Sequence, residues 1–360
     1  MAASGVQWWT VRLVVPGVTS RWARRAEDEG WDGIAFGDSQ NLAADTYVEL
    51  ALAAAATSRV GLGTAVTNPV TRHPAVTAGA IASIHGESDG RAVLGIGRGD
   101  SALAHLGMSP APVPVFARYL DRVQGYLRGD EVPFEVADDG AGEVRSADAL
   151  GMGGGPSASR LQWLSSTLPK VPVDVYCSGP RMIELAATRA DRITLSVGAD
   201  PERVRWGLEL ARAARAASGG GADLGDVGVF LPILVHPDQA TARALIAGGV
   251  ASVARFSVMH GTVTGPVGDD RRRQLEAVQA AYDMTRHYSH GSAQAAAVSD
   301  DVIDSFGVVG PTSACIERLQ ALVELGVRRI VVQAGVAGGD PAEMQAARRR
   351  LVEEVLPAVR

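Results

Sequence analysis

Several residue types that mark common protein classes are scarce in this chain. Its 360 residues contain two cysteines, Cys177 and Cys315, which exclude a disulfide framework and a cysteine-based zinc site and favour a reducing compartment. Lys170 is the only lysine and follows no predicted strand, so a Schiff-base lyase or aldolase is not expected. The chain has neither an apolar run of about 20 residues nor the basic and apolar N-terminal pattern of a signal peptide. We therefore expect a cytoplasmic protein without a membrane span.

The charge distribution argues against nucleic acid as a partner. The chain carries 34 Lys and Arg residues against 40 Asp and Glu, for a formal net charge of -6. The arginines are scattered along predicted helices, for example at 348–350, and form no basic stripe interleaved with aromatic residues. Hydrophobic residues make up 46% of the chain, which is enough to bury a sizeable core. No change of composition divides the sequence, so we expect a single domain over residues 1–360.

Strand and helix patterns alternate along the chain. Apolar runs predict strands at 11–15, 31–36, 60–66, 92–96, 173–177, 192–197, 227–235 and 329–333. Helical spacing predicts helices at 19–30, 47–58, 74–85, 116–127, 180–189, 201–217, 312–326 and 341–359. Eight strands that alternate with eight helices are the count of a (β/α)8 TIM barrel. An open doubly wound sheet is the alternative, because the order of elements does not show whether the sheet closes.

Two segments interrupt this alternation. Residues 128–172 follow the fourth helix, and residues 248–306 lie between the seventh and eighth strands. Both are too long for ordinary connections. We expect each to be an insertion that covers the barrel mouth or makes an oligomer contact, and both are candidates for substrate specificity.

Four short motifs stand where predicted strands end. They are Gly37-Asp38, the sequence TNPVTRHP at 67–74, Leu94-Gly95-Ile96-Gly97 followed by Gly99-Asp100, and Ser178-Gly179-Pro180. Parallel α/β folds bind ligands at the carboxyl ends of their strands. On these motifs the chain resembles the bacterial-luciferase-like superfamily, and within it the branch related to coenzyme F420-dependent methylenetetrahydromethanopterin reductase. Beyond Pro180 the resemblance extends only to the order of helices and strands.

The resemblance implies an oxidoreductase that transfers hydride between reduced coenzyme F420, a deazaflavin, and a small organic substrate. The alternative that it leaves open is an FMN-dependent monooxygenase, which would use reduced flavin and oxygen and would need a flavin reductase as partner. A protein that binds flavin without catalysis is a third hypothesis. Relatives also lead us to expect a homodimer. In each case the cofactor would supply the reactivity and the barrel its position.

The resemblance also assigns cofactor-binding residues. Ser178-Gly179-Pro180 would begin a helix whose backbone N–H groups hold the cofactor phosphate, although an ordinary turn needs the same small residues. Ala65-Val66-Thr67 matches the place where relatives carry a non-prolyl cis peptide in a strand bulge under the cofactor ring, and Asn68 follows it. Gly97-Arg98-Gly99 would add flexible backbone and one cation. Arg98 matches an arginine that binds the flavin phosphate in luciferase, so it supports FMN.

Two aspartates are candidates for acid–base catalysis. Asp100 matches a carboxylate near the deazaflavin in the reductase branch, and the alternative is a surface pair with Arg98. Asp38 ends the second strand, near the reacting ring in relatives, and the alternative is a helix N-cap or turn residue. Many deazaflavin relatives carry a histidine directly after this aspartate, but here the next residue is Ser39. The proton carrier is therefore Asp38, Asp100 or a histidine from elsewhere.

The second insertion contains a further group of polar residues. Asp283, His287 and His290 have helical spacing, which would place them on one helix face. A metal site there is conceivable, but no second carboxylate completes it, and flavin-type chemistry needs no metal. We therefore predict no metal and a solvated helix face. Tyr282 and His287 are candidates for substrate contact.

Overall fold

The predicted barrel is present and closed. The structure is a computed structural model that describes residues 5–134, 151, 155–221, 223–259, 261–333 and 337–360. In this part of the chain eight parallel strands form a ring in the order β1-β2-β3-β4-β7-β8-β9-β11, with β11 beside β1. Their bounds are β1 Gln7–Leu13, β2 Gly33–Gly37, β3 Gly61–Thr64, β4 Ala92–Ile96, β7 Val173–Cys177, β8 Arg192–Leu195, β9 Val227–Val235 and β11 Arg329–Gln333. The (β/α)8 TIM barrel is confirmed, and the open sheet is wrong.

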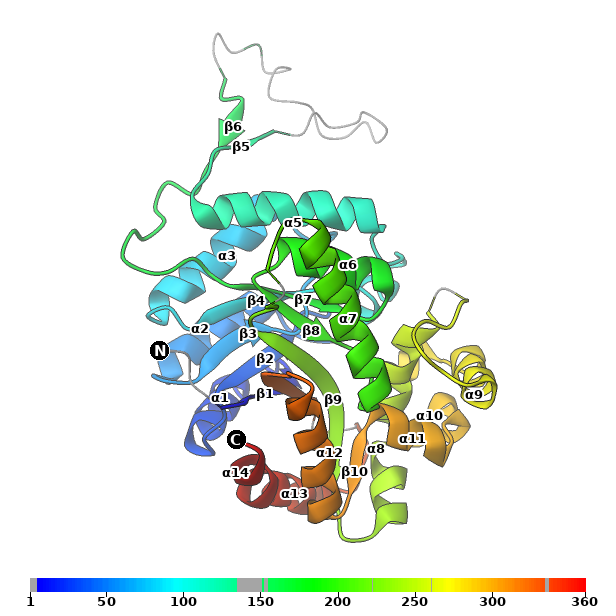
Figure 1. The fold of residues 1–360 in the computed structure, drawn as a ribbon. Coiled ribbons are helices and arrows are strands. Elements are labelled where there is room, and N and C mark those ends of the chain that lie inside the picture. Colours follow the sequence, from blue (N-terminus) through cyan, green and yellow to red (C-terminus); the bar gives the residue numbers. More distant parts are fainter. Residues whose placement is uncertain (1–4, 135–150, 152–154, 222, 260, 334–336) are drawn as a thin grey trace.

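Helices surround the barrel (Figure 1). They are α1 Thr19–Asp28, α2 Thr46–Ala56, α3 Pro74–Glu87, α5 Val113–Arg128, α6 Pro180–Arg189, α7 Pro201–Ala217, α12 Thr312–Glu324, α13 Pro341–Arg350 and α14 Leu356–Val359, with a short α4 Ser101–Ala104 before α5. Asp45 and Asp200 cap α2 and α7 by accepting hydrogen bonds from first-turn N–H groups. Within the described residues, no helix has the length and hydrophobicity to cross a bilayer.

Strand bounds follow the prediction closely, with two informative differences. Strands β4, β7, β9 and β11 have the predicted bounds. Strand β1 begins earlier because it includes Trp8, which packs under the helices, and Trp9, which points into the barrel. Strand β3 ends early because the chain bulges after Thr64 and rejoins β4 only through a bridge between Thr67 and Ile96.

The indole ring of Trp9 lies in the barrel interior and packs directly against the backbone of β2 and β3 at glycine residues. A Cβ atom added to Gly33 would lie 2.2 Å from Trp9 Cδ2, and one added to Gly61 would lie 2.9 Å from the same ring. Real Cβ atoms do not approach other atoms this closely, so β2 and β3 need glycine where the indole passes.

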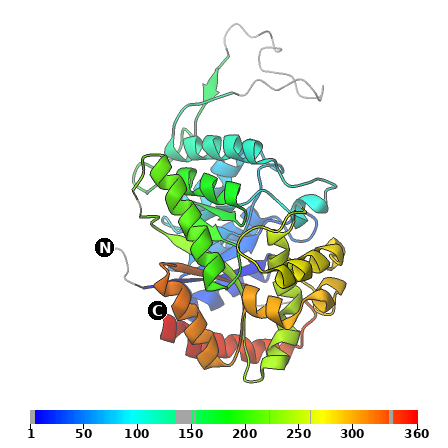
Figure 2. The same cartoon turned by 45° about the vertical axis from the view of Figure 1, so that its right-hand side comes forward.

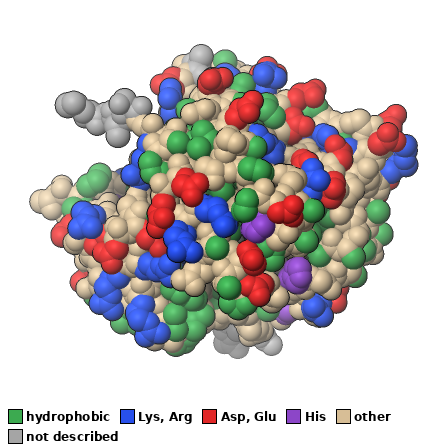
Figure 3. All heavy atoms as spheres, turned by 90° about the horizontal axis from the view of Figure 1, so that it is seen from below, with side chains coloured by type: hydrophobic (Ala, Val, Ile, Leu, Met, Phe, Trp, Pro, Cys, Tyr) green, Lys and Arg blue, Asp and Glu red, His purple; other side chains and the backbone are tan. Residues whose placement is uncertain are grey.

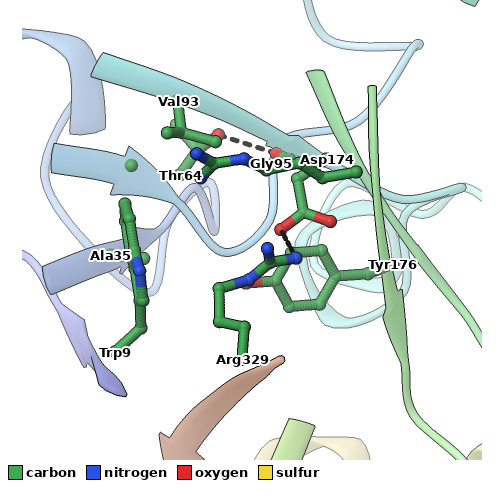
Figure 4. A pocket seen from close by; sticks show the side chains of 10 residues that line it. Trp9, Ala35, Thr64, Val93, Gly95, Asp174, Tyr176 and Arg329 are labelled. Carbon is green, nitrogen blue, oxygen red and sulfur yellow. Dashed lines mark hydrogen bonds and ion pairs between the residues drawn. The ribbon is translucent and has the colours of Figure 1, made fainter. Parts of the chain in front are cut away.

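Buried charges seal the end of the barrel where the strands begin. Arg329 of β11 is 1% exposed, and its Nη2 lies 3.0 Å from Asp174 Oδ2 of β7. Arg329 also pairs with Asp226, which binds Arg192 at 2.9 Å, and Thr194 donates a hydrogen bond to Asp174 at 2.9 Å. Figure 4 shows Asp174 and Arg329 facing each other beside a cavity of about 10 Å³. Because this end is closed by paired charges and holds room for about one water, a ligand must enter from the opposite end.

The segment between α5 and β7 lies at this closed end. Helix α5 leads the chain away from the mouth, and β5 Val132–Pro133 then pairs with β6 Ala158–Ser159 in a ribbon that projects beyond α5 (Figure 1). His85, in the last turn of α3, bonds Pro169 O at 3.0 Å. The expectation that residues 128–172 cover the mouth is therefore wrong for the part of this segment that the structure describes. Half of its glycine-rich run at 151–156, residues 152–154, falls outside the described residues.

The second insertion reaches the mouth. Strand β9 pairs with β8 and β11 inside the barrel, but its last three residues leave the ring and pair with β10 Val308–Gly310. Between β9 and β10 lie α8 Gln239–Ala254, η2 Arg255–Ser257, α9 Asp269–Ala280, η3 Met284–Arg286, α10 Ala293–Ala297 and α11 Asp300–Phe306. These elements form a separate layer beside the barrel (Figure 2). The insertion therefore begins with α8, before the predicted boundary at residue 248.

Candidate functional site

The predicted site residues meet on one side of the barrel mouth. Asp38 follows β2, residues 65–68 follow β3, residues 97–100 follow β4 and residues 178–180 follow β7. These four strands are consecutive neighbours in the sheet. Since the carboxyl ends of neighbouring parallel strands lie side by side, the four motifs form one continuous arc.

The bulge after β3 has the backbone geometry that the resemblance implies. The peptide bond between Ala65 and Val66 is cis, which confirms the expectation. Thr67 N–H donates to Gly95 O at 3.0 Å, and Gly97 N–H donates to Thr67 O at 3.0 Å. Both backbone groups of Thr67, directly after the cis bond, are thus bonded to β4 and to the residue that follows it.

Asn68 holds a hydrogen-bond donor without a partner. Its Oδ1 accepts from Val70 N–H at 3.0 Å and from Thr71 N–H at 3.1 Å, whereas its Nδ2 is buried and has no partner among the described residues. A Cβ atom added to Gly99 would lie 3.2 Å from Asn68 Cβ, so the loop after β4 covers this side chain. A buried amide donor gains free energy when a bound group accepts its hydrogen bond.

The surface inside the arc is apolar. Val11, Ala65 and Tyr176 are half-buried and pack on the apolar cluster that fills the barrel. Gly97 presents bare backbone beside them, where an added Cβ would lie 3.1 Å from Val66 Cγ2. An apolar floor with a glycine at its edge can accept the face of a flat ring.

Positive charge gathers where β7 turns into α6. Gly179 is the N-cap of α6 without a side-chain hydrogen bond, and Pro180 is its first residue. An added Cβ at Gly179 would meet nothing within 4 Å, so the helix start faces open space. Burial lowers the pKa of Arg98, and the like charge of Arg181 in the first turn lowers it further. Arg98 after β4, whose Nε donates to Ala111 O, and Arg181 in the first turn of α6 thus place positive charge near this helix N-terminus, an arrangement that attracts an anion.

Asp38 is a buried carboxylate held by several donors. It is 2% exposed, and its Oδ2 accepts from Thr67 Oγ1 at 2.8 Å and from Arg72 Nη1 at 2.5 Å. Gln40 Nε2 donates to its Oδ1 at 2.8 Å. The alternative of a helix N-cap is wrong, because Asp45 caps α2. Asp38 therefore ties the end of β2 to the loop after β3.

Asp100 pairs with the second insertion. Its carboxylate binds the guanidinium group of Arg255, the first residue of η2. Arg255 is 5% exposed, and its guanidinium carbon lies 4.4 Å from the ring centroid of Tyr282. Ser178 Oγ donates to Phe256 O of the same turn at 3.3 Å. The arc and the insertion are therefore joined at two adjacent strand ends.

Tyr282 and His287 contact each other beside this ion pair. The Tyr282 hydroxyl group lies against His287 Nδ1 and donates to Ser252 Oγ of α8 at 2.9 Å. The two candidates for substrate contact thus belong to one hydrogen-bonded group, on the insertion and next to Asp100.

The expected helix face of Asp283, His287 and His290 is wrong. Within the described part of this segment only residues 284–286 form a turn of 3-10 helix, which ends because His287 is extended (ψ 133°), and Tyr288 then has a φ of 56°. Asp283 accepts a hydrogen bond from Thr285 N–H at 2.9 Å. Throughout the described residues, no three His, Cys, Asp or Glu side chains converge to hold a metal ion.

Sequence reasoning missed three arginines of the site. Arg72 lies within the TNPVTRHP motif, so its place next to a strand end was a usable signal. Arg181 follows the predicted phosphate turn directly and could also have been singled out. Arg255 gave no signal, because its partner Asp100 is 155 residues away in the sequence.

His287 makes the stability of the fold depend on pH. The pKa of His287 is lowered to about 4, mainly because the ring is buried. The negative charge of Asp100 raises this pKa, whereas the positive charges of Arg255 and His105 lower it. The pKa of histidine in an unfolded chain is about 6.5, so the unfolded state binds more protons between pH 6.5 and 4, and stability falls as the pH drops through that range. We expect the parent to lose about 3 kcal/mol more of its free energy of unfolding than His287→Gln between pH 7 and 4, as measured by urea unfolding. Parallel losses would contradict a buried neutral imidazole.

Comparison with known sequences identifies the family. The model of a family described as luciferase-like monooxygenase matches residues 11–329. The F420-dependent glucose-6-phosphate dehydrogenase of Beutenbergia cavernae is 30% identical over 315 residues, which are 86% of this chain and 82% of that protein. The 5,10-methylenetetrahydromethanopterin reductase of Methanolobus tindarius is 26% identical over 314 residues, or 87% and 88% of the two chains.

Solved structures share the fold. The coenzyme F420-dependent tetrahydromethanopterin reductase from Methanopyrus kandleri matches with a TM-score of 0.73 at 21% identity, over 99% of this chain and 100% of that one. An F420-dependent secondary alcohol dehydrogenase in complex with an F420-acetone adduct matches with a TM-score of 0.69 at 17% identity, over 99% of both chains. Together with the family match over most of its length, these likenesses show that the chain belongs to the luciferase-like monooxygenase family and is an oxidoreductase of that class.

Proposed function

We propose that this protein binds coenzyme F420 at the barrel mouth and transfers hydride between the deazaflavin ring and a small organic substrate. The observation that carries the proposal is the positive corner formed by Arg98, Arg181 and the start of α6. It lies on the same arc as the cis bulge of β3, and a relative named as F420-dependent, the glucose-6-phosphate dehydrogenase of Beutenbergia cavernae, matches over 86% of the chain.

The corner suits the cofactor phosphate. The first-turn N–H groups of a helix have no partner within the helix, and the helix dipole places roughly half a positive charge there. Arg98 and Arg181 repel each other, so a phosphate between them relieves the repulsion as well as gaining charge-assisted hydrogen bonds. Gly179 leaves the approach to these donors open.

The rest of the arc suits the ring and its side chain. The apolar floor at Val11, Ala65 and Tyr176 would receive the ring face. Asn68 Nδ2, which is buried without a partner among the described residues, would donate to a polar edge of the cofactor. When bound, the deazaflavin supplies hydride chemistry at C5 of its ring, and the chain supplies position and exclusion of water.

The two aspartates would have different duties. Asp38 accepts hydrogen bonds from three side chains, which suits a carboxylate that orders the arc. Asp100 is partly exposed at the mouth and could meet the ring directly, with Arg255 holding its orientation. Both remain catalytic candidates, since Ser39 stands where many deazaflavin relatives have histidine.

An FMN-dependent monooxygenase is the second candidate. The observation in its favour is that Arg98 lies in the phosphate corner, as the resemblance to luciferase implies. FMN carries a ring and a phosphate of the same kind, so the same floor and corner would bind it. A flavin reductase would then be a partner, because reduced FMN has to be delivered.

The face shown in Figure 3 does not suggest nucleic acid as a partner. On the face shown in Figure 3, basic and acidic side chains are interspersed and form no stripe of one sign. This distribution agrees with a net charge of -6 and with a small-molecule substrate.

A second copy of the chain is the partner that α2 and α3 suggest. Val48 and Leu52 on α2 are 59% and 51% exposed, and Val76 on α3 is 57% exposed. The one charged residue of α2, Glu49, is 5% exposed, so the outer face of this helix is uncharged. Because an uncharged apolar face can pack against its own symmetry mate, we expect a homodimer through α2 and α3.

Gly179→Val tests the phosphate corner. The backbone of Gly179 is extended, with φ -97° and ψ 155°, so valine fits without strain and its side chain projects into the open space above α6. We expect at least about tenfold weaker F420 binding in a fluorescence titration and an unchanged melting temperature. Gly86→Val, at another open glycine, serves as the matched control. Equal affinity of the folded Gly179→Val variant and the parent would remove this turn from the site.

Leu52→Glu tests the dimer. A charge on the uncharged face of α2 would have to be buried in the interface, so the dimer should dissociate at least about tenfold more readily. Sedimentation equilibrium measures this, with Ala213→Glu on α7 as the control. If Leu52→Glu had the same average molecular mass in solution as the parent and as Ala213→Glu, an interface at α2 would be contradicted.

A further inference from the structure

Ser252 orders a chain of hydrogen bonds in the second insertion. Its hydroxyl group donates to Gly248 O at 3.0 Å within α8. Ser252 Oγ in turn accepts from the Tyr282 hydroxyl at 2.9 Å and from Tyr288 N–H at 3.3 Å. A serine hydroxyl has one hydrogen, and here it is used by the carbonyl group of Gly248. Tyr282 must therefore be the donor in its contact with Ser252.

This chain fixes the tautomer of His287. A phenol also has one hydrogen, and Tyr282 gives it to Ser252. In the contact between Tyr282 Oη and His287 Nδ1, the hydrogen must then come from the imidazole ring. The neutral ring therefore carries its proton on Nδ1 and a lone pair on Nε2. Nε2 has no hydrogen-bond partner within the described ranges.

The charges around the ring favour the neutral form. Asp100 faces His287 from the loop after β4, and Arg255 and His105 oppose its protonation from η2 and from the end of α4. Tyr288 packs on the ring edge, with centroids 4.3 Å apart. Because Asp100 is already paired with Arg255, its charge is largely neutralised. A neutral imidazole with a lone pair on Nε2 can accept a proton.

The imidazole is also held at the mouth. Tyr288 O accepts from Ala337 N–H at 3.0 Å, and His290 N–H donates to Ala337 O at 2.8 Å, which ties this segment to the loop after β11. Arg255 ties the insertion to the loop after β4. Strands β11 and β4 are four places apart in the ring of eight described strands, so the insertion crosses the mouth from one side to the other.

We propose that His287 is a catalytic base that accepts the hydroxyl proton of an alcohol or hemiacetal substrate on Nε2, with Tyr282 and Ser252 as positioning residues. This inference rests on the proposed F420 site. The substrate O–H bond breaks and its proton moves to Nε2, while the oxygen electrons form the C=O bond. The C–H bond breaks with both electrons, and a bound oxidised deazaflavin would accept them as hydride. The substrate loses two electrons, the cofactor gains them, and the imidazolium group returns its proton to water.

The tautomer can be measured without cofactor or substrate. Long-range ¹H–¹⁵N correlation spectra of the ¹⁵N-histidine-labelled protein at pH 7 distinguish a protonated ring nitrogen from one with a lone pair. His287→Gln removes one set of signals and so assigns them, and His290→Gln is the matched control that must leave them in place. We expect Nδ1 of His287 to be protonated and Nε2 to carry the lone pair. Tyr282→Phe should lose this preference, since the acceptor for Nδ1–H is gone. An Nε2–H tautomer or an imidazolium in the parent would overturn the proposal.

Titration with F420 separates the base from a binding residue. His287 lies on the insertion, apart from the phosphate corner. The dissociation constant of His287→Gln for F420 should therefore stay within about twofold of that of the parent. A larger loss would make His287 a binding residue and would overturn its role as a base. Absence of F420 binding by the parent would instead refute the proposed function, whatever the tautomer.

Discussion

The ion pair between Asp100 and Arg255 joins the two halves of the site. Asp100 belongs to the loop after β4, and Arg255 begins the turn that follows α8. Arg255 is almost fully buried, and an unpaired charge in such a place costs about 3–5 kcal/mol, so the pair holds the insertion over the mouth. Tyr282 stacks on the guanidinium group and contacts His287, so the position of the imidazole depends on the same pair.

The mouth has two chemically different sides. The arc from β2 to β7 offers backbone donors, glycine and two arginines, which suit a phosphate and a flat ring. The insertion offers a phenol, an imidazole and a serine, which suit proton transfer. The length of β9 makes this division possible, because its last residues leave the barrel and let α8 return toward the mouth. The closed end, with Arg329 and Asp174, supports both sides by fixing the strands below them.

The barrel could be predicted from the sequence because buried parallel strands are short apolar runs with clear ends. Strands β4, β7, β9 and β11 have the predicted bounds for this reason. The cis bond at Ala65-Val66 followed from the resemblance, and nothing in those residue types indicates it. The prediction of a helix from Asp283 to His290 was wrong. A spacing of four and three residues fits a helix, but Tyr288 has a positive φ and bonds Ser252 of α8 and Ala337, and these distant contacts leave no sequence pattern. The partner of Asp100 could not be predicted, since an ion pair over 155 residues leaves no local pattern.

We propose that the arc of motifs at the mouth is a deazaflavin site. The most direct test is to titrate the purified protein separately with F420 and with FMN and to follow the absorbance of each cofactor. We predict saturable binding of F420 that is at least about tenfold tighter than that of FMN, a difference of about 1.4 kcal/mol in binding free energy. Tighter binding of FMN, or binding of neither cofactor, would contradict it.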